Sequence, residues 1–265
     1  MHTYGFESYG VRIRVDCNDM RAMQLFKQLA IRSLVGRMSE IDPNLAEHRF
    51  LINYSKEKID IDLDGEVLAD SRANSGMVGW LDSRIRILVA EYAKDLVFMH
   101  AGVVGWNGKA LVFPANSYSG KTTVVEELVR QGAEYYSDEY AIFDTDGLVH
   151  PFPRPLSIRD ENGEKRNSDL RVETFGGRTG SAAIPVGAVI LTEFKRDGEW
   201  KLEILTAGVG VVEMIPQTFP IRVNTQFTLS VLQKVASNAI ILKGFRGEAE
   251  KFAETILNFI DKAVN

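Results

Sequence analysis

The fold is decided by the stretch Phe113-Pro114-Ala115-Asn116-Ser117-Tyr118-Ser119-Gly120-Lys121-Thr122-Thr123. Residues 109–113 form a short apolar run that predicts a strand before this stretch, and residues 124–131 predict a helix after it, closed by Gly132. A strand, a loop of small residues that ends in Gly-Lys-Thr and a helix are the setting of a phosphate-binding loop. In such a loop the backbone N–H groups and the positive end of the helix bind phosphate oxygens. The stretch therefore predicts a site for a nucleoside triphosphate.

The residues of this loop have separate expected parts. Lys121 is expected to reach the outer phosphates, and the Thr122 hydroxyl to hold a magnesium ion. The other nucleotide-binding residues of the loop are Asn116, Ser117, Tyr118, Ser119, Gly120 and Thr123. Ala115 stands where the general motif has glycine, and its methyl group costs little if its φ is extended. A helix N-terminus that carries Ser-Gly-Lys-Thr by chance is the alternative interpretation.

The composition is that of an ordinary globular protein, with 265 residues, 45% hydrophobic and 25% charged. A net charge of −5 argues against a nucleic-acid partner, which favours a basic face. The single cysteine, Cys17, excludes an internal disulfide and fits a reducing compartment. No apolar run approaches the ~18 residues that a membrane span needs, and the first residues lack the pattern of a signal peptide. We therefore expect a cytoplasmic protein without a membrane partner.

Two domains are expected, a small α+β module at 1–94 and a nucleotide-binding domain at 95–265. In the first, the sequence pattern predicts strands at 11–16, 49–54, 58–63 and 66–69, and helices at 19–38 and 77–93. In the second, it predicts strands at 96–104, 109–113, 135–143, 148–152, 156–159 and 239–242, a hairpin of 189–194 with 200–205, and helices at 124–131, 225–237 and 247–264. Residues 160–180 read as a loop with one short helix. Because strands outnumber crossover helices, we expect an α/β fold with a mixed sheet.

Acidic and basic residues beyond the loop are candidates for the chemistry. Asp138 and Glu139 lie in the next predicted strand. In enzymes with a phosphate-binding loop, a neighbouring strand supplies the carboxylate that binds the metal. The alternative is that both are solvent-facing strand residues. His100 lies in an apolar strand and is either a core residue or one that ends near the phosphates. Arg154 and Arg159 lie in a proline-stiffened segment that suits phosphate recognition, or in an edge strand with solvated side chains.

Taken together, these features resemble the HPr kinase/phosphorylase superfamily, including its short members that lack the usual N-terminal domain. Met99-His100-Ala101-Gly102 looks like the family's His-Gly or His-Ala strand. The loop 115–122 is similar to its Gly-x-Ser-Gly-x-Gly-Lys-[Ser/Thr] pattern, with Ala115 and Tyr118 in place of two glycines. Ser137-Asp138-Glu139 looks like its acidic pair, and residues 151–155 are similar to a stretch of the shorter relatives, some of which phosphorylate ribosomal peptides.

The resemblance implies a P-loop kinase core related to ATP-dependent phosphoenolpyruvate carboxykinase, with ATP and Mg²⁺ as cofactors. It implies that Asp138 is the base, that Glu139 or Thr122 contacts the metal, and that His100 lines the phosphate pocket, with Asp138 and Glu139 interchangeable. No stretch matches the second glycine-arginine signature of the full enzyme, so the resemblance leaves the phosphorylase reaction and the HPr substrate open.

The function we expect is a kinase for a hydroxyl of a peptide, protein or small molecule. Lys121 is counted with Asp138 and His100 among its catalytic residues. A non-catalytic nucleotide-binding regulator is the alternative, and a homo-oligomer remains open.

Overall fold

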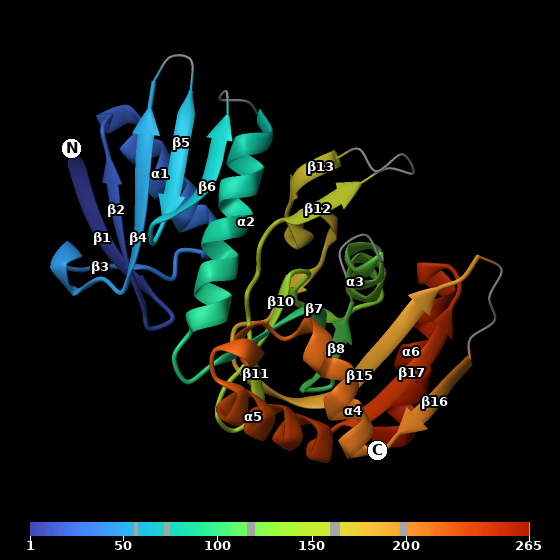
Figure 1. Cartoon of the computed structure of the whole chain (residues 1–265). Helices are drawn as coiled ribbons and strands as arrows, with labels where there is room; N and C mark the ends of the chain where they lie inside the picture. Colours follow the sequence, from blue (N-terminus) through green and yellow to red (C-terminus); the bar gives the residue numbers. More distant parts are fainter. Residues whose placement is uncertain (56–57, 72–74, 116–119, 160–164, 197–200, 265) are drawn as a thin grey trace. The chain divides into compact units, whose positions relative to one another are not determined.

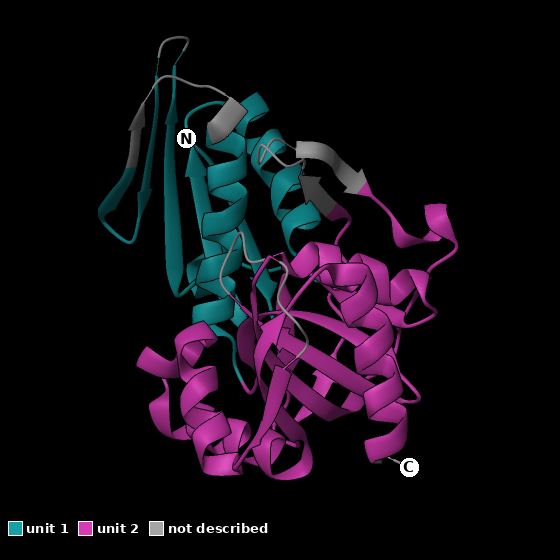
Figure 2. Cartoon of the chain, turned by 90° about the vertical axis from the view of Figure 1, so that its right-hand side faces the viewer, with its two compact units in different colours: residues 1–94 teal, residues 95–265 magenta. Residues whose placement is uncertain are grey.

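The computed structural model describes residues 1–264 with gaps at 56–57, 72–74, 116–119, 160–164 and 197–200. The chain divides into two compact units, Met1–Lys94 and Asp95–Asn265 (Figure 2). Each unit has a sheet of its own. Among the helices in the described part of the chain, none combines the length and the apolar character that crossing a bilayer requires.

The first unit is a six-stranded sheet in the order β3-β1-β2-β4-β5-β6 with two helices (Figure 1). Its elements are β1 (His2–Ser8), β2 (Val11–Cys17), α1 (Met20–Ser33), β3 (Ser39–Glu40), η1 (Pro43–Leu45), β4 (His48–Tyr54), β5 (Ile59–Leu63), β6 (Glu66–Ser71) and α2 (Ser75–Tyr92). Side chains from both helices join the alternating apolar residues of the strands in one core.

Helix α1 is shorter than the predicted 19–38. It begins after Asp19, whose carboxylate accepts a hydrogen bond from the Ala22 N–H at 2.8 Å. It ends at Ser33 because Val35 and Gly36 both have positive φ, and the Gly36 N–H donates back to the Ile31 carbonyl. Apolar periodicity continues beyond this point, which is why the sequence pattern alone did not place the end.

The second unit contains a nine-stranded mixed sheet, as expected from its excess of strands over helices. Its strands are β7 (Val97–Trp106), β8 (Lys109–Pro114), β9 (Glu134–Ser137), β10 (Tyr140–Phe143), β11 (Leu148–His150), β14 (Arg178–Thr179), β15 (Ile184–Phe194), β16 (Lys201–Leu205) and β17 (Ile240–Arg246). A separate pair is formed by β12 (Leu156–Arg159) and β13 (Lys165–Leu170). The helical elements are α3 (Lys121–Arg130), η2 (Val172–Phe175), α4 (Ala207–Met214), η3 (Ile215–Gln217), η4 (Phe219–Arg222), α5 (Thr225–Asn238) and α6 (Ala249–Val264).

Three strands of this sheet, β8, β15 and β17, run parallel to one another. Helices α3 and α6 contribute to the core on one face of the sheet, and α4 and α5 contribute to the core on the other (Figure 1). The carboxyl ends of parallel strands in such a layered fold are the usual place for a ligand. Here these ends are marked by Pro114, Phe194 and Arg246.

The predicted hairpin of 189–194 with 200–205 is wrong. Strand β17 lies between β15 and β16, parallel to the first and antiparallel to the second. Residues 160–180 also hold more regular structure than expected, because β13 pairs with β12 and β14 pairs with β9. The wrong hairpin and the missed pairing of β14 with β9 concern partners far apart in the sequence, which local turn signals do not report.

Helix α3 lies very close to β7, and Gly102 makes this approach possible. A Cβ atom at Gly102 would stand 2.6 Å from the Val125 Cγ2 atom of α3. We expect Gly102→Ala to lower the free energy of unfolding by about 1–3 kcal/mol through overpacking, measured by urea denaturation. Gly208→Ala in α4 is the matched control, because no atom lies within 4 Å of its Cβ position and it should not lower stability. Equal stability of the two variants would contradict this account.

Candidate functional site

Strand β7 brings the candidate residues together because it is paired along both edges. On one edge Ala101 lies opposite Pro114 of β8, and the Ala115 N–H donates to the His100 carbonyl at 3.3 Å. On the other edge β7 pairs first with β10 and then with β9, so that His100 lies opposite Tyr140 and Val103 opposite Ser137. The two residues between these pairs, Asp138 and Glu139, therefore lie across β7 from the start of the loop.

The predicted strand 135–143 is interrupted at the acidic pair. The Ser137 hydroxyl accepts hydrogen bonds from the Glu139 and Tyr140 N–H groups, at 3.0 and 2.9 Å. Residues 138–139 form a bend between β9 and β10. Such a bend relaxes the strict alternation of faces that an unbroken strand would impose on neighbouring carboxylates.

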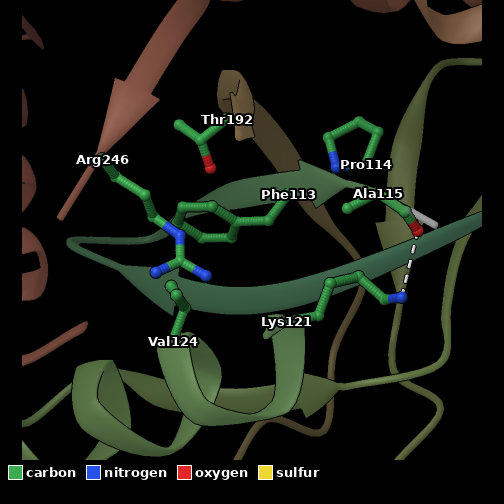
Figure 3. A pocket seen from close by; sticks show the side chains of 7 residues that line it. All are labelled: Phe113, Pro114, Ala115, Lys121, Val124, Thr192 and Arg246. Atoms are coloured by element: carbon green, nitrogen blue, oxygen red, sulfur yellow. Dashed lines mark hydrogen bonds between the residues drawn. The ribbon is translucent and has the colours of Figure 1, made fainter. Parts of the chain in front are cut away.

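Lys121 is the first residue of α3 and its side chain is buried, with 9% of the residue exposed. Its Nζ donates to the Ala115 carbonyl at 3.0 Å and lies 3.2 Å from the His100 Nε2 (Figure 3 draws the first contact). Burial lowers the pKa of the Lys121 ammonium, while the charges of Glu139 and Asp138 act in the opposite direction. His100, Lys121 and both carboxylates thus act on one another within one site.

A chain of hydrogen bonds holds Asp138. The Thr122 hydroxyl donates to its Oδ2 at 3.1 Å, and the buried Tyr135 hydroxyl lies 3.0 Å from its Oδ1. The same Tyr135 hydroxyl lies 2.6 Å from the Arg154 carbonyl oxygen. Because a phenol has one proton, Tyr135 shares its donation between a carboxylate and a carbonyl. The Thr122 hydroxyl, by contrast, donates its proton to Asp138 without this competition.

The pKa of Asp138 is raised to about 6. Burial is the largest cause and the charge of Glu139 adds to it, while the hydrogen bonds from Tyr135 and Thr122 and the charge of Arg154 lower it only in part. A carboxylate with such a pKa is ionised at neutral pH and still takes up a proton readily, which suits a general base.

The oxygen atoms of Thr122 and Asp138 form a donor set of the kind that Mg²⁺ prefers. Within the described ranges, no group of three or more histidine, cysteine or acidic residues is arranged to hold a metal ion by itself. Mg²⁺ usually keeps several water ligands and is bound through one or two protein oxygens together with phosphate oxygens. The residues present fit that mode of binding and not an all-protein cage.

The two ends of the loop, Ala115 and Gly120, differ in whether their backbone conformation requires a glycine. Gly120 has φ +81° and forms the N-cap of α3, so a glycine is needed there. Ala115 is not among the described non-glycine residues with positive φ, so its methyl group is accommodated without that strain. The predicted nucleotide-binding residues Asn116, Ser117, Tyr118 and Ser119 lie outside the described residues.

The two predicted arginines are placed differently. Arg154 belongs to the segment that contacts Tyr135, and its charge acts on Asp138. Arg159 is the last residue of β12, in the two-stranded sheet apart from the main one. The structure therefore groups Arg154 with the acidic pair, while the side chain of Arg159 lies outside what the structure describes.

One residue of this region, Arg246, was missed by the sequence analysis. It ends β17, is 4% exposed, and lines a small hollow at the carboxyl ends of β8 and β15 (Figure 3). The hollow is lined by Phe113, Pro114, Ala115, Lys121, Val124, Thr192 and Arg246. The predicted strand ended at 242, so the sequence pattern did not place Arg246 beside the loop.

No protein-family model matches the chain, and no curated protein matches it at a significant level.

The Thr122 hydroxyl should have a measurable effect on Asp138. In the metal-free protein we expect Thr122→Val to raise the pKa of Asp138 above about 6, because the ionised carboxylate loses the hydrogen bond from the Thr122 hydroxyl. The ¹³C chemical shift of the labelled aspartate carboxyl group, followed against pH, measures this. Thr123→Val is the matched control, since Thr123 is the exposed neighbour on α3. An unchanged titration in Thr122→Val would contradict the hydrogen bond.

Proposed function

We propose that this protein is an ATP-dependent, Mg²⁺-requiring kinase with a P-loop kinase core, which transfers the γ-phosphoryl group to a hydroxyl of a peptide, protein or small molecule. The observation that carries the proposal is the 3.1 Å hydrogen bond between Thr122 and Asp138 beside the buried Lys121. These groups come from α3 and from the bend after β9, yet they meet where the strand-loop-helix motif predicts phosphates. The similarity of the motifs to HPr-kinase-like proteins supports the same reaction.

Lys121 acts on the donor. Its Nζ donates to the Ala115 carbonyl oxygen and lies 3.2 Å from the His100 Nε2 atom, and a phosphate oxygen can replace the carbonyl oxygen as its acceptor. The Lys121 ammonium attracts an anionic phosphate oxygen more strongly than a neutral carbonyl oxygen, so the exchange favours the bound nucleotide. His100 remains at the edge of the phosphate pocket and keeps the ammonium directed toward it.

Asp138 acts on the acceptor. The acceptor hydroxyl oxygen forms a bond to the γ-phosphorus, the bond between this phosphorus and the β,γ-bridging oxygen breaks, and the hydroxyl proton passes to the Asp138 carboxylate. Phosphoryl transfer asks the protein mainly for alignment and for neutralisation of charge. The bonds from Thr122 and Tyr135 fix the carboxylate for this task, and Arg154 adds positive charge near it.

Mg²⁺, when bound, neutralises charge on the β- and γ-phosphate oxygens. Thr122 and one of the two carboxylates would hold it, and the other carboxylate then faces the acceptor. If Asp138 is the base, Glu139 is the carboxylate that would bind the metal. It is close enough for its charge to affect the pKa of both Lys121 and Asp138.

Substitution of the two central residues should abolish transfer. We expect Asp138→Asn to lower kcat by about 10²–10⁴-fold, the usual contribution of a general base. Lys121→Ala should lower kcat/KM for ATP by a comparable factor because a buried charge at the phosphates is lost. Transfer from [γ-³²P]ATP to candidate acceptors, with ADP release measured in parallel, tests both variants.

Glu254→Gln is the control for these substitutions, because Glu254 is exposed on α6. Full activity of Asp138→Asn would remove the base assignment. Tight nucleotide binding without any product would instead favour a nucleotide-binding regulator.

The pH dependence should follow the Asp138 carboxylate. Because its pKa is raised to about 6 and the ionised form is the active one, kcat/KM for ATP should be constant above this pH and fall about tenfold per unit below it. The measurement holds the concentration of fully ionised MgATP constant across the pH series. A profile that stays flat between pH 5 and 7 would show that this carboxylate does not act as the base.

A further inference from the structure

The buried guanidinium of Arg246 has no part in the kinase chemistry described above. It ends β17 on the same face of the sheet as Phe113 of β8 and Thr192 of β15, and all three line the hollow (Figure 3). Lys121 and Arg246 lie on opposite sides of this hollow, and Gly120, which directly precedes Lys121 in the sequence, contacts Arg246 through its carbonyl oxygen. Two cationic side chains therefore approach the same loop from two different elements.

The backbone at Gly120 is shaped around Arg246. A Cβ atom at Gly120 would stand 2.7 Å from the Arg246 Nη2 atom. The same Nη2 donates to the Gly120 carbonyl at 3.5 Å, at the long limit of a hydrogen bond, and Nη1 donates to the Gly247 carbonyl at 3.1 Å. These bonds go to neutral carbonyl oxygens, so an anionic oxygen in the hollow would be a stronger acceptor.

Aromatic rings hold the guanidinium in this position. The Arg246 guanidinium carbon lies 5.4 Å from the ring centroid of Phe194 and 5.8 Å from that of Phe252. Burial lowers the pKa of Arg246, and the negative charge of Glu248 offsets this only in part. The hollow is therefore lined by a buried cation, in surroundings of low polarity that strengthen its attraction for an anion.

We propose that Arg246 is a second cationic ligand for the phosphate chain of the bound nucleotide, and that it exchanges the Gly120 carbonyl for a phosphate oxygen. Arginine presents several N–H donors in a planar fork that matches phosphate oxygens. Lys121 binds the chain from the side of His100, and Arg246 binds it from the side of β17. This inference rests on the proposed nucleotide site, but it requires no transfer.

The test is calorimetric titration of the full chain with Mg²⁺ and ATP, ADP, tripolyphosphate or adenosine. We expect Arg246→Met to weaken ATP and tripolyphosphate by about 10–100-fold, the usual loss for one charged hydrogen bond. Arg246→Lys should lie between this variant and the unmodified protein, and adenosine should bind all three equally. Arg222→Met removes an exposed arginine and is the control. A folded Arg246→Met variant with unchanged affinity for tripolyphosphate would overturn the proposal.

A second measurement covers the case in which Arg246→Met does not fold. In the unmodified protein, the side-chain ¹⁵N–¹H resonances of Arg246 should shift on addition of tripolyphosphate. Resonances that stay unchanged at saturation would overturn the proposal. Failure of the kinase proposal gives a different result, because a chain that binds tripolyphosphate through Arg246 and transfers nothing contradicts only the transfer.

Discussion

The pairing of β7 along both of its edges is the constraint on which the site depends. One edge fixes the end of β8 and thereby the start of the loop before α3, and the other fixes the bend that carries Asp138 and Glu139. Gly102 of β7, which pairs with Phe113 of β8, lets α3 approach the strand, so that Thr122 reaches the carboxylate. The backbone hydrogen bonds of β7 thus fix the positions from which these side chains contact one another.

Burial gives the charged groups of this region their character. Lys121 and Arg246 lose part of their preference for the charged form, and Asp138 loses part of its preference for the ionised form. In each case the neighbouring charges or hydrogen bonds offset the effect of burial on the pKa only in part. A ligand that carries negative charge and a metal ion would offset these shifts, which supports the proposed magnesium-bound phosphate chain over a neutral ligand.

The sequence predicted what local patterns encode. Alternation and helical periodicity predicted β2, β4, β8, α2, α5 and α6 to within a few residues, and the motifs around His100, Lys121, Thr122 and Asp138 selected residues that the structure brings into contact. Pairing between distant segments was not readable, because the hydrophobic pattern of β15 and β16 is the same whether they pair with each other or with β17. Arg246 was missed for that reason: its role follows from the neighbour of its strand, not from its own surroundings in the sequence.

The place of β17 between β15 and β16 has a consequence for synthesis of the chain. Strand β16 leaves the ribosome before β17, yet β17 is its partner in the sheet among the described residues. The segment around residues 201–205 must therefore wait, with an exposed strand edge, while about forty further residues are made. We infer that the second unit folds late and as a whole, and that the nascent chain is vulnerable to aggregation until Arg246 has emerged.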